Sequence, residues 1–304
     1  MKSYIGFVLT FAVAAQAFAE QVLYCAGTVR YPSGEPAAGV SVEYYPGHHD
    51  GAGVYAEAKT DANGRYKMNG QKDIAIYSGI IIKTNSIMAR DVEKNLAMVK
   101  DVHMTTTNVD LVLQPAITLS GSVKNTEGAP IAEAEAQFGF WFGQIHLLEG
   151  RPIKVNQLGQ FSMSALPQGR RYQVYVGSAN SYGLEDADIQ PADTWTNRYE
   201  FPTFVLKRAD RKIAGRVLDE TGKPFAGVEV SFSGKGQPMN SFDKWSQEWL
   251  CNTKTDANGN FLFDAICDGP IQVHADTYKA GGYTFQSTQA GDTNFIIRLP
   301  ASSR

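Results

Sequence analysis

Apolar and polar residues alternate along most of this chain with a period of two. Val40, Val42 and Tyr44 alternate with polar neighbours, and similar runs occupy residues 172–176 and 228–232. Such alternation places one face of a strand on a core and the other face in water. Gly, Pro, Asn and Asp clusters interrupt the runs about every 8–12 residues, as in antiparallel sandwiches. The pattern predicts an all-β fold, in which only residues 243–250 favour a short helix.

Two short motifs, Gly-x-Val and Gly-x-Pro, recur three times at a constant interval of 94 residues. A third element, a turn that ends in glycine before an aromatic residue, follows later in each copy. Two motifs would not keep the same register by chance, so the sequence predicts three tandem domains, each large enough to bury its own core. The positions are Gly27, Gly121 and Gly215; Pro36, Pro130 and Pro224; and Gly64, Gly159 and Gly259.

The expected domains cover residues 20–115, 116–209 and 210–304, with very short linkers near Pro115-Ala116 and Ala209-Asp210. Residues 1–19 are typical of a cleaved signal peptide, because Lys2 precedes an apolar run that ends in Ala17-Phe18-Ala19. That run is shorter than the roughly 20 residues that a membrane span needs. We therefore expect an exported protein, periplasmic or extracellular, without a membrane span.

The overall composition narrows the class of function. The chain is 43% hydrophobic and 19% charged with a net charge of −3, which becomes −4 when the signal peptide is removed. This is an ordinary globular composition, and it lacks the basic excess typical of nucleic-acid-binding domains. No serine-hydrolase elbow, zinc-protease motif or phosphate loop occurs. We therefore expect neither a catalytic residue nor a cofactor, and no nucleic-acid partner.

The three motifs together resemble the carboxypeptidase regulatory-like domain, whose signature combines Gly-x-Val, Gly-x-Pro-x-x-Gly-Val-x-Val and Thr-Asp-x-x-Gly-x-Phe. The second copy departs from it at Glu133, Asn156 and Gln157. The resemblance implies three tandem Greek-key β-sandwiches of the transthyretin-like type. It also implies a non-enzymatic exported bacterial protein, with a structural or protein-interaction role at the cell envelope. The third copy carries the match at Gly215, Val217, Gly222, Pro224, Gly227, Val228, Val230, Thr255, Asp256, Gly259 and Phe261.

One group of residues suggests a metal site, since the intradiol dioxygenases among the relatives of this sandwich bind iron through tyrosine and histidine. The first copy holds Tyr44, Tyr45, His48 and His49. The two histidines are adjacent, so in an extended chain their rings point to opposite sides. We favour an exposed loop over a metal site.

Cys251 and Cys267 flank the turn around Asn258-Gly259, on strands expected to be neighbours. A disulfide between them is plausible in an oxidising compartment, and two buried thiols are the alternative. Cys25 is then interpreted as a small buried residue, and the sequence does not decide whether it is free.

Three tryptophans are candidates for stacking on a ligand. Trp141 lies in an aromatic run, and Trp245 and Trp249 are four residues apart in an insertion that only the third copy has. Exposed tryptophans stack on sugar rings, whereas tryptophans that cap a sandwich or fill a domain interface only pack. The second hypothesis is therefore an array of carbohydrate-binding modules, with a polysaccharide in place of an envelope protein as partner.

Overall fold

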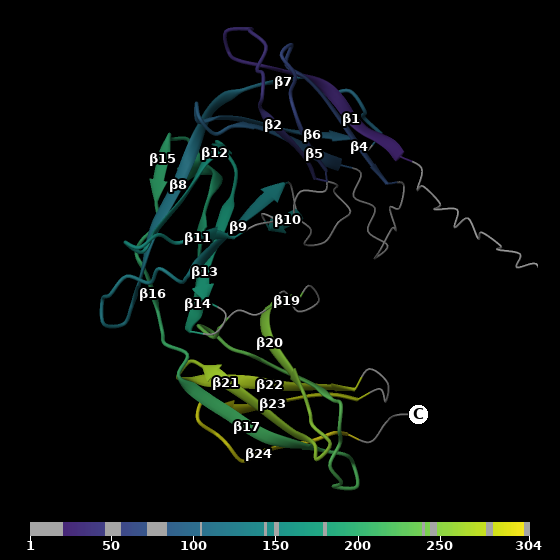
Figure 1. Cartoon of the computed structure of the whole chain (residues 1–304), viewed down its shortest axis with the longest axis vertical. Helices are drawn as coiled ribbons and strands as arrows, with labels where there is room; N and C mark the ends of the chain where they lie inside the picture. Colours follow the sequence, from purple (N-terminus) through teal and green to yellow (C-terminus); the bar gives the residue numbers. More distant parts are fainter. Residues whose placement is uncertain are drawn as a thin grey trace, which may run out of the picture.

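A computed structural model describes ten segments of the chain (Figure 1). The predicted signal peptide lies outside them. Three groups of strands follow one another along an arc, and each group forms two facing sheets. The described residues are 21–45, 56–71, 84–103, 105–142, 145–148, 152–178, 181–238, 241–243, 248–277 and 282–300.

The first sandwich packs the sheet β4-β1-β7 against strands ordered β6-β5-β2-β3. Tyr66 and Met68 face Val42 and Ile87 across its core. Strand β1 pairs antiparallel with β4 and parallel with β7, so the closing strand of the domain returns beside the first. The strands are β1 (Gln21–Arg30), β2 (Ser41–Tyr45), β3 (Ala56–Lys59), β4 (Arg65–Gln71), β5 (Thr84–Asp91), β6 (Leu96–His103) and β7 (Leu111–Val112).

The second sandwich packs strands β12, β8, β15 and β16 against the sheet β10-β9-β13-β14, to which β11 adds. Phe138, Phe140, Phe161 and Tyr172 dominate its core. A short 3₁₀ helix, η1 (Pro191–Thr194), follows β14. The strands are β8 (Gln114–Asn125), β9 (Glu135–Phe142), β10 (Ile145–Leu148), β11 (Ile153–Lys154), β12 (Gln160–Pro167), β13 (Tyr172–Ser178), β14 (Tyr182–Ile189), β15 (Arg198–Glu200) and β16 (Phe204–Leu206).

The third sandwich packs the sheet β21-β17-β24 against the sheet β19-β20-β18-β22-β23. Phe232 and Phe263 meet edge to face in its core, with ring centroids 4.8 Å apart. The strands are β17 (Arg211–Leu218), β18 (Glu229–Ser233), β19 (Ser241–Asp243), β20 (Glu248–Lys254), β21 (Asn260–Ile266), β22 (Pro270–Thr277), β23 (Gly282–Gln289) and β24 (Phe295–Arg298).

The predicted all-β fold is confirmed. Of residues 243–250, where a short helix was expected, Asp243 and residues 248–250 are strand, and residues 244–247 lie outside the described segments. Asp243 ends β19, and residues 248–250 open β20, with which β19 pairs antiparallel. The hydrogen bonds of these residues thus go to a neighbouring strand, because pairing in a sheet overrides a weak local preference for helix. No helix of the described segments is long and apolar enough to cross a membrane.

The repeated Gly-x-Val motif has a packing cause. A Cβ on Gly121 would lie 2.5 Å from the ring of Phe161, and one on Gly215 would lie 2.2 Å from the carbonyl oxygen of Phe295. Only glycine lets the aromatic residue of the later turn and the closing strand approach the first strand so closely. The same requirement therefore returns in each copy at the same interval.

The turns before β4, β12 and β21 also share one geometry. In the third copy, Asn258 N and Asn260 N donate to Asp256 Oδ1 at 2.8 Å, and Gly259 has φ of 74°. The hydrogen bonds from Asn260 hold the pKa of the Asp256 carboxyl below its usual value. Asn156 Oδ1 accepts the equivalent bonds in the second copy. The amide oxygen therefore serves where the sequence departs from the family signature.

Candidate functional site

Polar contacts cross both joints between the described sandwiches. At the first joint the chain does not pass through a linker, because Pro115 and Ala116 are part of β8. The start of β8 pairs with β6 of the first sandwich, and the rest of it pairs with β12 of the second. One strand therefore belongs to both sandwiches and joins their sheets into a single eight-stranded sheet.

A buried arginine closes this first joint. Arg90, on β5, donates from Nε to the carbonyl oxygen of Ala165 (3.2 Å) and from Nη2 to that of Ser164 (3.1 Å). Its Nη1 lies 3.6 Å from Oε1 of Glu43, and both side chains are only 9% exposed. Glu43 also accepts a 2.7 Å hydrogen bond from the hydroxyl of Tyr45. A guanidinium in this position satisfies two carbonyls of the second sandwich and one buried carboxylate of the first.

Two strained residues face each other across the same joint. Asn95 and Ala165 have φ of 51° and 56°, the left-handed values that non-glycine residues of the described segments adopt only here. The backbone N–H of Ala165 donates to Asn95 Oδ1 (2.8 Å), and Asn95 Nδ2 donates to the carbonyl oxygen of Ala116 (3.0 Å). Left-handed backbone costs energy and persists only where its surroundings hold it. The first joint is therefore a specified contact.

The second joint connects β14 to the third sandwich. Gly183 packs so closely that a Cβ there would lie 2.0 Å from the carbonyl oxygen of Gly236 and 3.0 Å from Cys267 Sγ. Next to it, Leu184 N donates to the carbonyl oxygen of Gln237 (3.0 Å). The buried Gln237 side chain exchanges two 2.9 Å hydrogen bonds with the backbone of Cys267. The backbone bond from Leu184 thus crosses the joint, and the Gln237 amide fixes the part of the third sandwich that accepts it.

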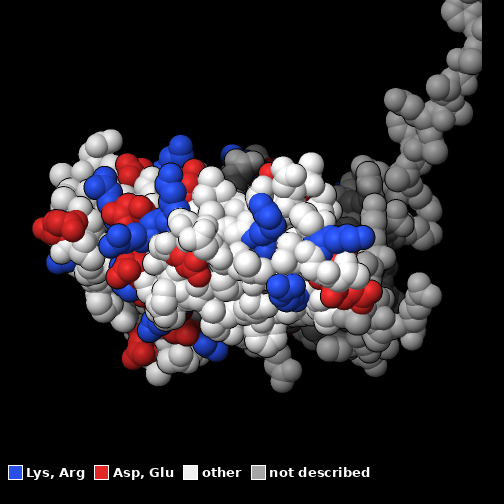
Figure 2. Space-filling view, turned by 90° about the horizontal axis from the view of Figure 1, so that it is seen from below, with Lys and Arg blue, Asp and Glu red and all other residues white. Residues whose placement is uncertain are grey.

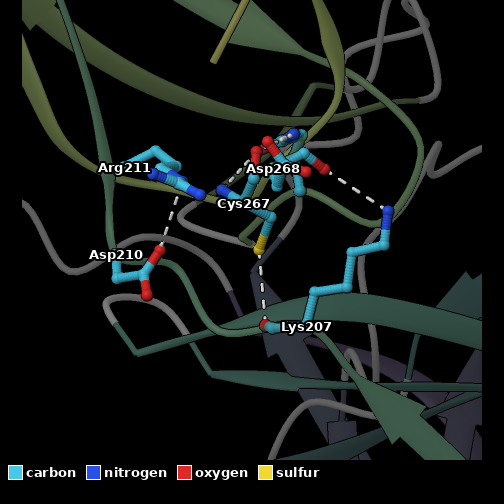
Figure 3. A network of polar contacts seen from close by, with 6 residues as sticks. Lys207, Asp210, Arg211, Cys267 and Asp268 are labelled. Carbon is cyan, nitrogen blue, oxygen red and sulfur yellow. Dashed lines mark hydrogen bonds and ion pairs between the residues drawn. The ribbon is translucent and has the colours of Figure 1, made fainter. Parts of the chain in front are cut away.

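Cys267 lies at the centre of this second joint (Figure 3). Its Sγ donates to the carbonyl oxygen of Lys207 (3.4 Å), and Lys207 Nζ donates to that of Asp268 (3.3 Å). Asp210 and Arg211 form an exposed ion pair beside them, 3.7 Å apart. The segment that leads from the second sandwich into the third is therefore tied to the turn after β21.

The predicted disulfide partners are both buried thiols in this structure, as is Cys25. Cys251 Sγ donates to the carbonyl oxygen of Pro238 (3.5 Å). The expectation that their strands are neighbours in one sheet is wrong: β20 pairs with β18, and β21 pairs with β17 of the opposite sheet. A bridge would therefore connect the two sheets across the core. It stays a prediction, which mapping of peptides without reductant tests.

We expect the thiols to react slowly with iodoacetamide at pH 8. Burial raises the pKa of Cys251 and of Cys267 from 9.0 to about 11, so the native chain holds about a hundredfold less thiolate at these positions. Mass spectrometry after timed alkylation, with and without denaturant, measures this. Rapid labelling of both cysteines in the native protein would contradict it.

The same raised pKa values predict a loss of stability in alkali. The folded chain favours the protonated thiols. Their contribution to the free energy of unfolding is therefore complete below pH 9 and is lost as the pH rises towards 11.

The tryptophan candidates have different outcomes. Trp141 is half-buried on β9. The guanidinium carbon of Arg171 lies over its ring, 4.4 Å from the ring centroid, and the same guanidinium forms a 3.0 Å ion pair with Asp188. Trp245 and the side chain of Trp249 lie outside the described residues. The structure instead exposes a tryptophan that sequence reasoning missed, Trp195. Its signal was an aromatic residue in the polar Thr-Trp-Thr-Asn segment that follows Pro191.

The suggested metal ligands do not come together among the described residues. Tyr44 stacks on Tyr24 with ring centroids 5.3 Å apart, and the Tyr45 hydroxyl is engaged with Glu43. His48 and His49 lie outside the described segments. Within those segments there is no group of three or more His, Cys, Asp or Glu that could hold a metal ion.

Hollows in the surface of the described segments include one at the second joint and one on the second sandwich. One, of about 420 Å³, lies at the second joint and is lined by Glu185, Asp186, Lys235, Gln272 and Ser287 among others. The other, of about 410 Å³, runs over the second sandwich along β8, β12 and β15. Figure 2 shows Lys and Arg mixed with Asp and Glu, beside broad uncharged areas, on the face in view. That face offers no continuous basic surface to a polyanion.

Comparisons with known proteins name no family. No family model matches the chain. No curated protein matches it either. The solved structures that resemble it include a streptococcal ancillary pilin, at 9% identity and a TM-score of 0.33, over 94% of this chain and 100% of the pilin. Another is GBS52, a minor pilin of Streptococcus agalactiae, at 14% identity and a TM-score of 0.30, over 60% of this chain and 95% of the pilin. Likenesses this low carry no argument about function.

Proposed function

We propose that this chain is an exported, non-enzymatic scaffold of three carboxypeptidase regulatory-like sandwiches, which holds a protein partner at the cell envelope. The observation that carries the proposal is the first joint, where β8 belongs to two sandwiches and Arg90 closes the contact. Domains joined by flexible linkers move independently, whereas a shared strand holds two domains in one orientation. A fixed arc is what a spacer or an assembly subunit needs, and loops and sheet edges along it are available for contacts.

The test measures where the expressed protein is found in the cell and what shape it has in solution. The chain is expressed from residue 1 in a bacterial host, and the product is located by fractionation and its N-terminus is sequenced. We expect it to begin at Glu20, outside the cytoplasm. Small-angle X-ray scattering of this product is expected to fit one curved shape. A photo-reactive residue at the exposed Leu262 of β21 is expected to crosslink a discrete envelope protein in the native host.

A flexible chain in scattering, or a product that keeps residues 1–19 in the cytoplasm, would overturn the proposal. A rigid, exported product that crosslinks to no protein would overturn the role of a protein partner. A polysaccharide partner is the second candidate, and the exposure of Trp195 is the observation that favours it.

A further inference from the structure

The exposed Trp195 sits on a surface built to hold it. Trp195 caps the C-terminus of η1, and 71% of its surface is accessible to solvent. Large aromatic side chains contribute most to folding when they are buried. An indole exposed to this extent therefore adds little to the stability of the sandwich, and its role must be sought in what it can contact.

The position of the indole ring is determined by a glycine and a buried threonine. Gly169 has φ of 70°, and a Cβ there would lie 2.4 Å from Cζ2 of Trp195, so the ring rests directly on the backbone of Gly169. The neighbouring Thr194 is fully buried, and the single O–H of its hydroxyl is shared between the carbonyl oxygens of Pro191 (2.9 Å) and Arg170 (3.1 Å). The ring is thus pre-organised, which lowers the entropy cost of binding a ligand.

The residues next to Gly169 and Trp195 in the chain are hydrogen-bonded to one another. Gln168 Nε2 donates to the carbonyl oxygen of Thr196 (2.8 Å), and it lies 3.4 Å from Oδ1 of the exposed Asn197. The carbonyl oxygen of Asn197 in turn accepts a 2.9 Å hydrogen bond from Thr118 N on β8. The segment that carries Trp195 is therefore bonded to β8 through the backbone of Asn197.

The second, independent observation is the groove of about 410 Å³ along β8, β12 and β15. Strand β15 begins three residues after Trp195, and its Arg198 lines the groove. The lining is rich in hydroxyl and amide groups. Its charged groups are Lys154 and the ion pair Arg198–Glu200, whose atoms are 3.9 Å apart. Its polar side chains include Ser120, Ser122, Ser162, Gln160, Arg198 and Glu200.

We propose that Trp195 and this groove form a binding site for a neutral oligosaccharide. An indole face packs on the apolar face of a pyranose with equatorial hydroxyls, while hydroxyl, amide and charged groups bond to its hydroxyls. Lys154 and Arg198 against Glu200 leave the lining a single net positive charge. That is too little to hold a polyanion, and the hydroxyl and amide groups favour an uncharged ligand. This site is separate from the role of scaffold: it can bind sugar whether or not the chain holds a protein partner, so either proposal can fail alone.

The test is a titration of residues 20–304 with cellohexaose, followed by NMR of the indole N–H groups. The chain has four tryptophans, so Trp195→Phe assigns the Trp195 resonance by its loss. We expect a saturable shift of that resonance with a dissociation constant in the millimolar range, and an affinity at least about tenfold lower for Trp195→Ala. Ser120→Ala and Glu200→Gln are expected to weaken binding about two- to fivefold each, as single hydrogen bonds do.

Two further variants make the result specific. Gly169→Ala keeps the indole but pushes it out of its place. It is expected to weaken binding because the ring no longer has the position that the ligand needs. Leu158→Ala removes another 71% exposed apolar side chain from the same sandwich and is expected to leave binding unchanged. No saturable shift with cellohexaose, chitohexaose or mannohexaose up to about 20 mM would overturn the proposal, as would equal affinity of Trp195→Ala and the parent. Full affinity in both groove variants would remove the groove from the site.

Discussion

Replacement of Arg90 by alanine is expected to lower the free energy of unfolding of the first two sandwiches by about 3–5 kcal/mol. The change leaves the buried Glu43 carboxylate without its cation, and it leaves the carbonyl groups of Ser164 and Ala165 without their donors. A buried charge that loses its partner keeps its full desolvation cost. Guanidinium-induced unfolding followed by circular dichroism measures the effect, as an early transition that the parent lacks.

Arg211→Ala is the matched control for this prediction. Arg211 also pairs with a carboxylate, that of Asp210, but both side chains of that pair are more than half exposed. Exposed pairs contribute about 0–1 kcal/mol, so the control is expected to unfold like the parent. The double variant Arg90→Met/Glu43→Gln is expected to recover part of the loss, because it removes the buried charge as well. If Arg90→Ala and Arg211→Ala unfolded together, Arg90 would not hold the first joint.

Gly183→Ala is expected to open the second joint. The new methyl group would lie 2.0 Å from the carbonyl oxygen of Gly236, a backbone atom that cannot rotate away. Overpacking of this kind costs about 1–3 kcal/mol, and here separation of the two sandwiches relieves it. Small-angle scattering is expected to show a larger radius of gyration, and Cys267, which the joint covers, is expected to alkylate faster than in the parent.

Gly177→Ala provides the control for this change. Gly177 lies on the adjacent strand β13. A Cβ there would lie 3.1 Å from Cδ1 of Leu184 and 3.2 Å from the carbonyl oxygen of Gly183, contacts that a shift of a few tenths of an ångström relieves. We expect this variant to keep the scattering profile of the parent and the slow labelling of Cys267. An unchanged profile for Gly183→Ala would mean that the second joint tolerates the added volume, and that Gly183 does not determine how the last two sandwiches pack.

Two predictions about the third sandwich are corrected by its strand pairing. Residues 243–250 were expected to favour a helix, and their described ends are strands that pair with each other. Cys251 and Cys267 were expected on adjacent strands because they flank a turn, yet that turn connects opposite sheets. Both interpretations used local spacing alone, and in a Greek-key sandwich a turn does not reveal whether the chain stays within one sheet.

The all-β class, the repeat of 94 residues and the shared turns were determined by the sequence itself. They rest on local rules: strand alternation, turn carboxylates or amides, and glycines where an aromatic ring must lie on the backbone. Only the tertiary structure decided that β8 runs through two sandwiches, that Arg90 is buried between them and that Trp195 is exposed. These features depend on contacts between separate strands, such as those of Arg90 with carbonyl groups 74 and 75 positions later, or on the surface that remains once the sandwiches have packed. No local pattern in the chain encodes them.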